Sequence, residues 1–214
     1  MDVFEYGNCT ARTVLLQPVG EYDPESIENE IAVIRKNSAE DFRLTAFRVC
    51  DWNRDLSPWK APAVFGGEDF GGRAADTLGE IMKYCAEDRT KIYCIGGYSL
   101  AGLFALWAAY QTDCFRGVAA ASPSMWFPGF PDFMREHEIQ SRHVYLSLGD
   151  KEEKTRNPVL AAVGKQIRAA YVLLGEQNTD CILEWNEGNH FKDAALRTAK
   201  AFLWVMKRQQ CAGE

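Results

Sequence analysis

Short apolar runs of strand length alternate along the chain with longer segments whose apolar residues recur every three or four positions. The first pattern is typical of strands buried on both faces, and the second of helices that cover a sheet. We predict strands at 13–19, 42–49, 92–95, 117–121, 143–148 and 181–185. We predict helices at 24–34, 73–84, 103–110, 159–174 and 192–208, the first of them capped by Asp23. Strands that alternate with helices need crossover connections, so the pattern predicts a mostly parallel sheet with helices on both faces.

The alternation continues through all 214 residues without a break in composition, a repeat or a low-complexity tract. This length suits one α/β domain with a two-sided core. The segment between the strands at 117–121 and 143–148 is too short to hold a large lid domain. We therefore expect one α/β domain that spans residues 1–214.

Charge and cysteine usage narrow the class of protein. A net charge of −6, with Lys and Arg scattered rather than clustered, argues against a nucleic-acid partner. The first residues lack a signal-peptide pattern, and apolar runs stay short of the ~20 residues that a membrane span needs. The seven cysteines include no CxxC pair and no histidine at a zinc-like spacing. We expect a cytoplasmic protein that uses no metal or other cofactor and has no membrane partner.

One serine stands where a predicted strand turns sharply into a predicted helix. The sequence Gly97-Tyr98-Ser99-Leu100-Ala101 links the strand at 92–95 to the helix at 103–110. Small residues two positions before and two after the apex permit a tight turn that exposes the hydroxyl in strained geometry. This pattern is typical of a nucleophile, which needs a base and an acid nearby.

The base and the acid are sought on the same edge of the sheet. The chain has three histidines, His137, His143 and His190. His137 lies in a charged stretch expected to face solvent, and His143 opens a strand. His190 lies in the loop between the strand at 181–185 and the helix at 192–208, at the same sheet edge as the serine turn, so we select it as the base. The acid is expected between serine and histidine in the chain, in the loop that follows the strand at 143–148. That loop offers Asp150, Glu152 and Glu153, and the residues alone do not choose among them.

An acyl-transfer site also needs N–H donors for the oxyanion. The backbone N–H of Leu100, directly after the serine, is the first candidate. We expect the second from the loop after the strand at 13–19, at Gly20 or Glu21.

Four segments resemble the esterase family of α/β-hydrolases that contains esterase D-type and enterochelin esterase-like enzymes. They are residues 97–106 around the serine, 121–126 (Ala-Ser-Pro-Ser-Met-Trp), 148–152 (Leu-Gly-Asp-Lys-Glu) and 188–191 (Gly-Asn-His-Phe). The resemblance implies a single-domain α/β-hydrolase fold without a large lid. It implies Ser99 as nucleophile, His190 as general base and Glu152 as the orienting acid, with Asp150 as the second choice.

The chain departs from the family pattern in three places. Ala101 stands where the family has a second glycine, and the acid is a glutamate where aspartate is commoner. The N-terminal segment is short, so we expect it to lack an opening edge strand or hairpin.

The resemblance implies a carboxylic ester hydrolase that forms an acyl intermediate on Ser99 and acts on a small-molecule ester. Trp52, Trp59 and Trp126 follow strands at the same edge and are candidates for the pocket, although packing in the core explains each of them equally well. An acyltransferase that uses the same three residues, or a non-catalytic binding protein with a hydrolase scaffold, remains as an alternative. The sequence predicts neither the substrate nor the oligomeric state.

Overall fold

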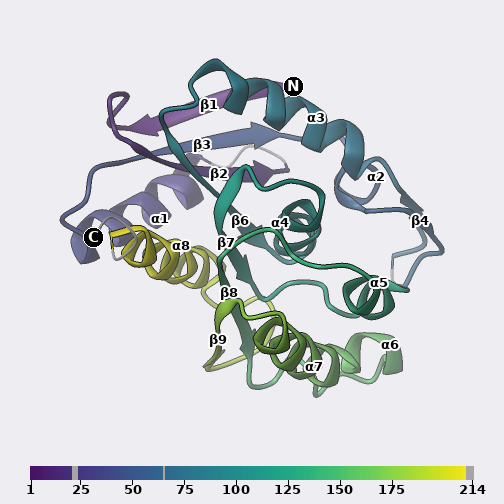
Figure 1. Ribbon diagram of the computed structural model, residues 1–214. Coiled ribbons are helices and arrows are strands. Elements are labelled where there is room, and N and C mark those ends of the chain that lie inside the picture. Colours follow the sequence, from purple (N-terminus) through teal and green to yellow (C-terminus); the bar gives the residue numbers. More distant parts are fainter. Residues whose placement is uncertain (21–23, 65, 211–214) are drawn as a thin grey trace.

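A seven-stranded sheet forms the centre of the protein (Figure 1). The computed structural model describes residues 1–20, 24–64 and 66–210. In the sheet the strands lie in the order β1 (Asp2–Gly7), β3 (Phe42–Arg48), β2 (Thr13–Val19), β6 (Ile92–Tyr98), β7 (Phe115–Ala121), β8 (His143–Gly149) and β9 (Asp180–Asn186). Strand β1 runs antiparallel to β3, and every other neighbouring pair is parallel. The predicted α/β sheet and its six predicted strands are therefore confirmed.

Helices cover both faces of this sheet and enclose two apolar cores (Figure 1). One core lies beneath α1 (Pro24–Asn37) and α8 (Ala194–Gln210), which pack side by side. The other core lies beneath α3 (Ala74–Glu87), α4 (Leu100–Gln111), α5 (Phe130–Glu136) and α7 (Val163–Glu176). Asp23, which we predicted as the cap of the first helix, lies outside the described residues.

Helix α4 directly follows the serine and is buried on all sides. All of its residues from Leu100 to Tyr110 are buried, which explains why its sequence is apolar all round rather than along one stripe. The helix packs against strands β6 and β7, while α2 (Trp52–Leu56) contacts it from outside the sheet. Ser99 therefore sits on a rigid base between a central strand and a fully packed helix.

The expectation that the N-terminal segment lacks an edge strand is wrong. Residues Asp2–Gly7 form β1 and pair with β3 in the register Asp2↔Arg48 to Gly7↔Arg43. Partly buried and exposed residues alternate along β1, as expected of a strand with one face in water. Ion pairs of Asp2 with Arg48 and of Glu5 with Arg43 link the two strands across the register.

The structure adds several short elements to those predicted and divides one predicted helix. The connection after β3 contains α2 and a two-stranded hairpin of β4 (Lys60–Ala61) and β5 (Phe70–Gly71). The loop after β7 contains α5. The helix predicted at 159–174 is divided into α6 (Pro158–Ala161) and α7.

Candidate active site

Ser99 occupies a strained turn at the carboxyl end of β6. Its φ of 59° and ψ of −121° lie in a region that residues other than glycine rarely adopt. The turn is close-packed: a Cβ added to Gly97 would lie 2.7 Å from the Cβ of Ala101. One of these two positions must therefore be glycine, and because Gly97 supplies it, alanine is accommodated at position 101.

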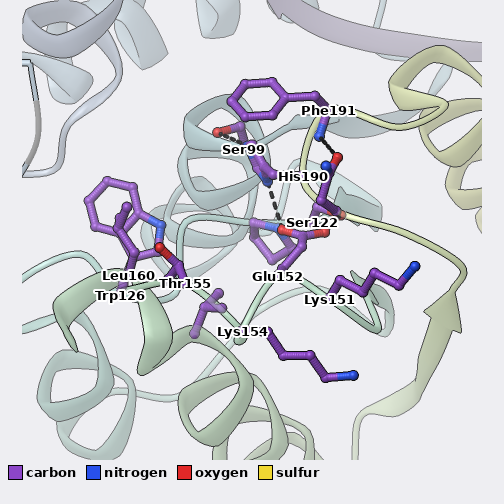
Figure 2. Close-up of a pocket in the computed structure, with 13 residues that line it drawn as sticks. Ser99, Ser122, Trp126, Lys151, Glu152, Lys154, Thr155, Leu160, His190 and Phe191 are labelled. Carbon is purple, nitrogen blue, oxygen red and sulfur yellow. Dashed lines mark hydrogen bonds and ion pairs between the residues drawn. The ribbon is translucent and has the colours of Figure 1, made fainter. Parts of the chain in front are cut away.

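Ser99, His190 and Glu152 form one hydrogen-bonded chain (Figure 2). Nε2 of His190 lies 3.0 Å from Oγ of Ser99, and Nδ1 lies 2.7 Å from Oε2 of Glu152. A proton on Nδ1 leaves Nε2 as the acceptor for the serine hydroxyl. The three side chains come from the turn after β6, the loop after β8 and the loop after β9, which meet at the carboxyl edge of the parallel strands.

Asp150 and Glu152, two of the three carboxylates that the sequence left open, have different partners. Asp150 accepts a hydrogen bond of 2.7 Å from the backbone amide of Gly188 and so holds the histidine loop through its main chain. Only Glu152 of the two contacts the imidazole. Glu153 points away from the site and pairs with Arg168.

Glu152 is almost completely buried yet held as an anion. Its Oε1 accepts hydrogen bonds from the Gly149 amide at 2.7 Å, the Ser122 hydroxyl at 2.8 Å and Nη1 of Arg197 at 2.9 Å. Burial by itself would raise the pKa of Glu152, but the hydrogen bonds from His190, the Gly149 amide and Ser122 outweigh it and the pKa lies below its usual range. A charged carboxylate behind the imidazole favours the tautomer that the serine requires.

The other two histidines lie in different surroundings. His137 stacks on the ring of Phe133 and hydrogen bonds to the carbonyl of that residue. His143 pairs with Asp180 across β8 and β9, at the opposite end of these strands from the histidine loop. Of the three histidines, His190 is the one whose ring contacts both Ser99 and Glu152.

Two of the three candidate oxyanion donors, Leu100 and Gly20, lie within the described residues. Leu100 is the first residue of α4, and the first amides of a helix have no acceptor within the helix. Gly20 directly follows β2, the parallel neighbour of β6, and a methyl group added to it would lie 3.2 Å from the ring of Trp52. Glu21 lies outside the described residues.

A cavity of about 390 Å³ opens beside the serine. Its apolar wall contains Trp126, Leu160 and Val163, while Lys151, Lys154 and Thr155 follow along the loop that carries Glu152 (Figure 2). The cavity also has Phe191 at its rim, with 90% of that side chain exposed.

Of the three tryptophans predicted at the mouth of the site, only Trp126 lines this cavity. Trp59 packs among Phe127, Phe130 and Phe133, and its Nε1 donates to the carbonyl of Pro128. Trp52 begins α2 and lies against Gly20 and the apolar core. For these two residues a packing role explains the sequence, because both are partly buried against the larger apolar core.

Two contributors to the site carried no sequence signal as strong as that of Ser99. Ser122, with a φ of 42°, directly follows β7, and its hydroxyl donates to Glu152. Arg197 lies in the first turn of α8, where a basic residue on an amphipathic helix ordinarily faces solvent, and is instead buried behind Glu152. The position of Ser122 in the Ser-Pro-Ser segment was the available signal, whereas Arg197 could be found only from the fold.

The described residues contain neither a candidate metal site nor a candidate membrane span. Across residues 1–20, 24–64 and 66–210, His, Cys, Asp and Glu side chains form no group of three or more that could hold a metal ion. In the same ranges, no helix is both long and apolar enough to cross a membrane.

No family model and no curated protein sequence matches the chain. Among solved structures, an IroE-like serine hydrolase from Shewanella oneidensis superposes with a TM-score of 0.75 at 15% identity, over 92% of this chain and 71% of that one. The enterobactin esterase FES from Shigella flexneri superposes with a TM-score of 0.71 at 15% identity, over 98% of this chain and 55% of that one. A Bacillus cereus carboxylesterase gives a TM-score of 0.60 at 15% identity, over 97% and 94% of the two chains.

The chain thus spans about half the length of the Shigella esterase and nearly the whole length of the Bacillus enzyme. At this level of identity the comparison concerns the fold, and it agrees with the resemblance to enterochelin esterase-like proteins that the four sequence segments indicated. The protein has the α/β-hydrolase fold, with the mostly parallel sheet that it shares with these serine hydrolases and esterases.

Proposed function

We propose that the protein is a serine hydrolase that cleaves carboxylic esters of small molecules. The observation that carries this proposal is the hydrogen-bonded chain from Glu152 through His190 to Ser99, at a strained turn that opens into a cavity. A structural serine would have no need of a buried carboxylate and an imidazole aligned on its hydroxyl. The same three residues in this chain order are the arrangement that activates a serine in this fold.

In the proposed acylation, His190 carries one proton from Ser99 to the departing alcohol. Nε2 of His190 takes the proton of Ser99 while Oγ attacks the ester carbonyl, and the new C–O bond produces a tetrahedral oxyanion. In this proposal the charge on Glu152 stabilises the imidazolium, and the amide of Leu100, the first residue of α4, donates to the oxyanion. The imidazolium then gives its proton to the departing alcohol as the original ester bond breaks.

Deacylation repeats these steps with water. His190 takes a proton from a water molecule, whose oxygen attacks the acyl-Ser99 carbonyl, and the proton returns to Oγ as the acid product leaves. The cavity supplies space for the acyl group against Trp126, Leu160 and Val163, and its open rim leaves room for water.

The solved neighbours support the same class of substrate. Their names describe serine hydrolases, a carboxylesterase and an esterase studied in the presence of enterobactin. We infer from them a small-molecule ester as substrate, and from the apolar wall of the cavity an acyl group of modest size.

The test combines covalent labelling with turnover. A fluorophosphonate probe should add once to the wild-type protein, measured by intact mass, and the wild type should release p-nitrophenol from short-chain esters. Ser99→Ala should lose both signals. Ser124→Ala is the matched control, because its hydroxyl lies 3.4 Å from that of Ser99 and yet is not positioned against an imidazole, so labelling should persist.

The other outcomes separate the alternatives. Product that appears only when an alcohol or thiol acceptor is supplied would identify an acyltransferase that uses the same intermediate. A folded wild-type protein that neither reacts with the probe nor turns over esters would overturn the proposal and favour a binding protein.

A further inference from the structure

Arg197 is a buried cation in a protein whose charged residues otherwise lie mostly at the surface. Only 1% of the residue is exposed, and it lies in the first turn of α8, the helix that covers the central strands. A buried charge costs several kcal/mol unless an opposite charge and hydrogen bonds compensate it. The groups that compensate the charge of Arg197 therefore indicate the role of this residue.

One nitrogen of the guanidinium holds the acid. Nη1 lies 2.9 Å from Oε1 of Glu152 and also donates to the hydroxyls of Ser122 and Tyr98, at 3.2 Å and 3.1 Å. Because the donors from Arg197, Ser122 and Gly149 all converge on Oε1, Oε2 is left for His190. These three donors thus fix the orientation of the carboxylate independently of the imidazole.

The second nitrogen holds the loop of the base. Nη2 donates to the backbone carbonyls of Glu187 and Asn189, each at 3.1 Å, and Asn189 directly precedes His190. Tyr98, which Nη1 contacts, donates in turn to the carbonyl of His190 at 2.7 Å. One rigid, planar group therefore spans the acid and the main chain on both sides of the turn that carries the base.

The positive charge of Arg197 also weakens the negative electrostatic potential that Glu152 produces at the imidazole of His190. Paired with Arg197, Glu152 presents His190 with one end of an ion pair rather than with an isolated negative charge. Among the described residues, the other charged or titratable groups near the histidine are Tyr98, Asp150, Lys151, Lys154, Asp193 and the Glu187–Lys192 ion pair. Replacing Arg197 changes none of these side chains and removes a hydrogen bond from only one of them, Tyr98.

We propose that Arg197 is a positioning residue that locks Glu152 and the His190 loop into one unit and offsets the charge of the acid. This inference rests on the proposed function, because it assigns Arg197 to the base and acid of that reaction. A purely structural arginine would stabilise α8 without influencing the pH at which the histidine becomes an effective base.

Two variants separate the geometry from the charge. Arg197→Lys keeps the cation but cannot span both partners, so kcat should fall about 100-fold with KM little changed, the size of effect expected from a misplaced catalytic group. In Arg197→Lys the acid limb of the pH profile should stay close to that of the wild type. Arg197→Gln removes the charge, and the acid limb should then move upward by about one pH unit, since an uncompensated carboxylate favours the imidazolium.

The matched control is Arg168→Gln, which breaks the exposed ion pair of Glu153 in the same loop. Its kcat and pH profile should equal those of the wild type. The measurements are kcat, KM and fluorophosphonate labelling rate against pH, on variants whose near-ultraviolet circular dichroism matches that of the wild type.

The outcomes distinguish the two proposals. Wild-type kcat in Arg197→Lys, or an unshifted acid limb in a folded Arg197→Gln, would overturn the positioning role while leaving the hydrolase intact. If Arg197→Gln does not fold, kcat in Arg197→Lys decides alone. A wild type without labelling or turnover would remove the proposed function, and this role with it.

Discussion

At the scale of single residues, the backbone of Ser99 adopts a strained conformation that exposes its side chain at the turn. An L-residue at φ 59° and ψ −121° pays a conformational penalty of about 1–3 kcal/mol that neighbouring packing must offset. The offset comes from α4, which is buried along almost its whole length. The proposed nucleophile therefore has a backbone conformation that lowers stability.

This conflict predicts different stabilities for two inactive variants. Ser99→Ala keeps the strained backbone, whereas Ser99→Gly relieves it because glycine adopts such conformations readily. We expect Ser99→Gly to be more stable than Ser99→Ala by about 1 kcal/mol in urea unfolding. Equal stabilities, or a more stable alanine variant, would show that the turn is not strained.

The two carboxylates of the loop after β8 should differ sharply in mutation. Glu152→Gln keeps the shape but lacks the charge that fixes the imidazole tautomer, and turnover should fall by about 10³–10⁴-fold. Asp150→Asn changes only an acceptor for the Gly188 amide and should cost far less. Steady-state kinetics of both variants test this ranking, and the reverse order would assign the acid to Asp150.

At the scale of elements, the turn between β6 and α4 has room for a Cβ at position 97 or at position 101, but not at both. A Cβ added at Gly97 would lie 2.7 Å from that of Ala101, closer than real Cβ atoms come. Gly97→Ala should therefore displace the serine and reduce the labelling rate about 100-fold. Adding Ala101→Gly to that variant removes the closest contact and should restore part of the rate.

The control for this prediction is Gly79→Ala in α3, where an added methyl group meets nothing within 4 Å. That variant should label at the wild-type rate. If the double variant is no faster than Gly97→Ala, the contact with Ala101 is not the cause of the defect.

The main strands and helices were predictable because each one carries its own pattern. The run at 92–95 and the alternation at 42–49 have the period and length of strands, and β6 and β3 lie where these patterns placed them. The five residues of α2 and the two-residue strands β4 and β5 are too short to show a period. Contacts between distant segments define them, such as the hydrogen bond from the Gly72 amide to Ser57.

The candidate site was predictable to the extent that sequence order fixes position on a sheet. Ser99 and His190 follow strands that end at one edge, so their meeting could be anticipated, and the resemblance chose Glu152. Which carboxylate turns inward depends on the loop, where the Gly149 amide and Ser122 receive Glu152. No local sequence pattern indicates the role of Arg197. Its contact with Glu152 depends on how α8 packs on its face of the sheet.

At the scale of the whole molecule, stability should depend on a carboxyl group remote from the site. Glu30 lies in α1, is 2% exposed and accepts a hydrogen bond of 3.2 Å from Gln17. Burial raises the pKa of Glu30 to about 8, against a partial lowering by Gln17. The folded protein therefore keeps a proton there that the unfolded chain releases near its usual pKa of 4.5.

The sign of the effect follows from this difference in proton binding. The contribution of Glu30 is fully present below pH 4.5 and is lost as the pH rises toward about 8, because the unfolded state then binds fewer protons. Relative to wild type, Glu30→Gln should gain on the order of 3 kcal/mol of unfolding free energy between pH 5 and pH 8. Glu28→Gln, an exposed position on the same helix, should show no such gain.

Urea unfolding at pH 5, 6, 7 and 8 measures this prediction. Subtracting the curves of the two variants from that of the wild type cancels the other titrating groups. Parallel curves for wild type and Glu30→Gln would show that Glu30 is charged in the folded protein.

The packing of α8 has a consequence for how the protein is made. This helix lies on β6, β7 and β8, and Phe202 and Val205 fit against glycines of β6 and β7. A ribosome produces those strands well before it produces α8, so one face of the central sheet stays uncovered during much of translation. During that time the nascent chain has an exposed apolar surface of the kind that makes folding intermediates prone to aggregate. The proposed esterase activity should appear only after the segment that carries Arg197 has left the exit tunnel.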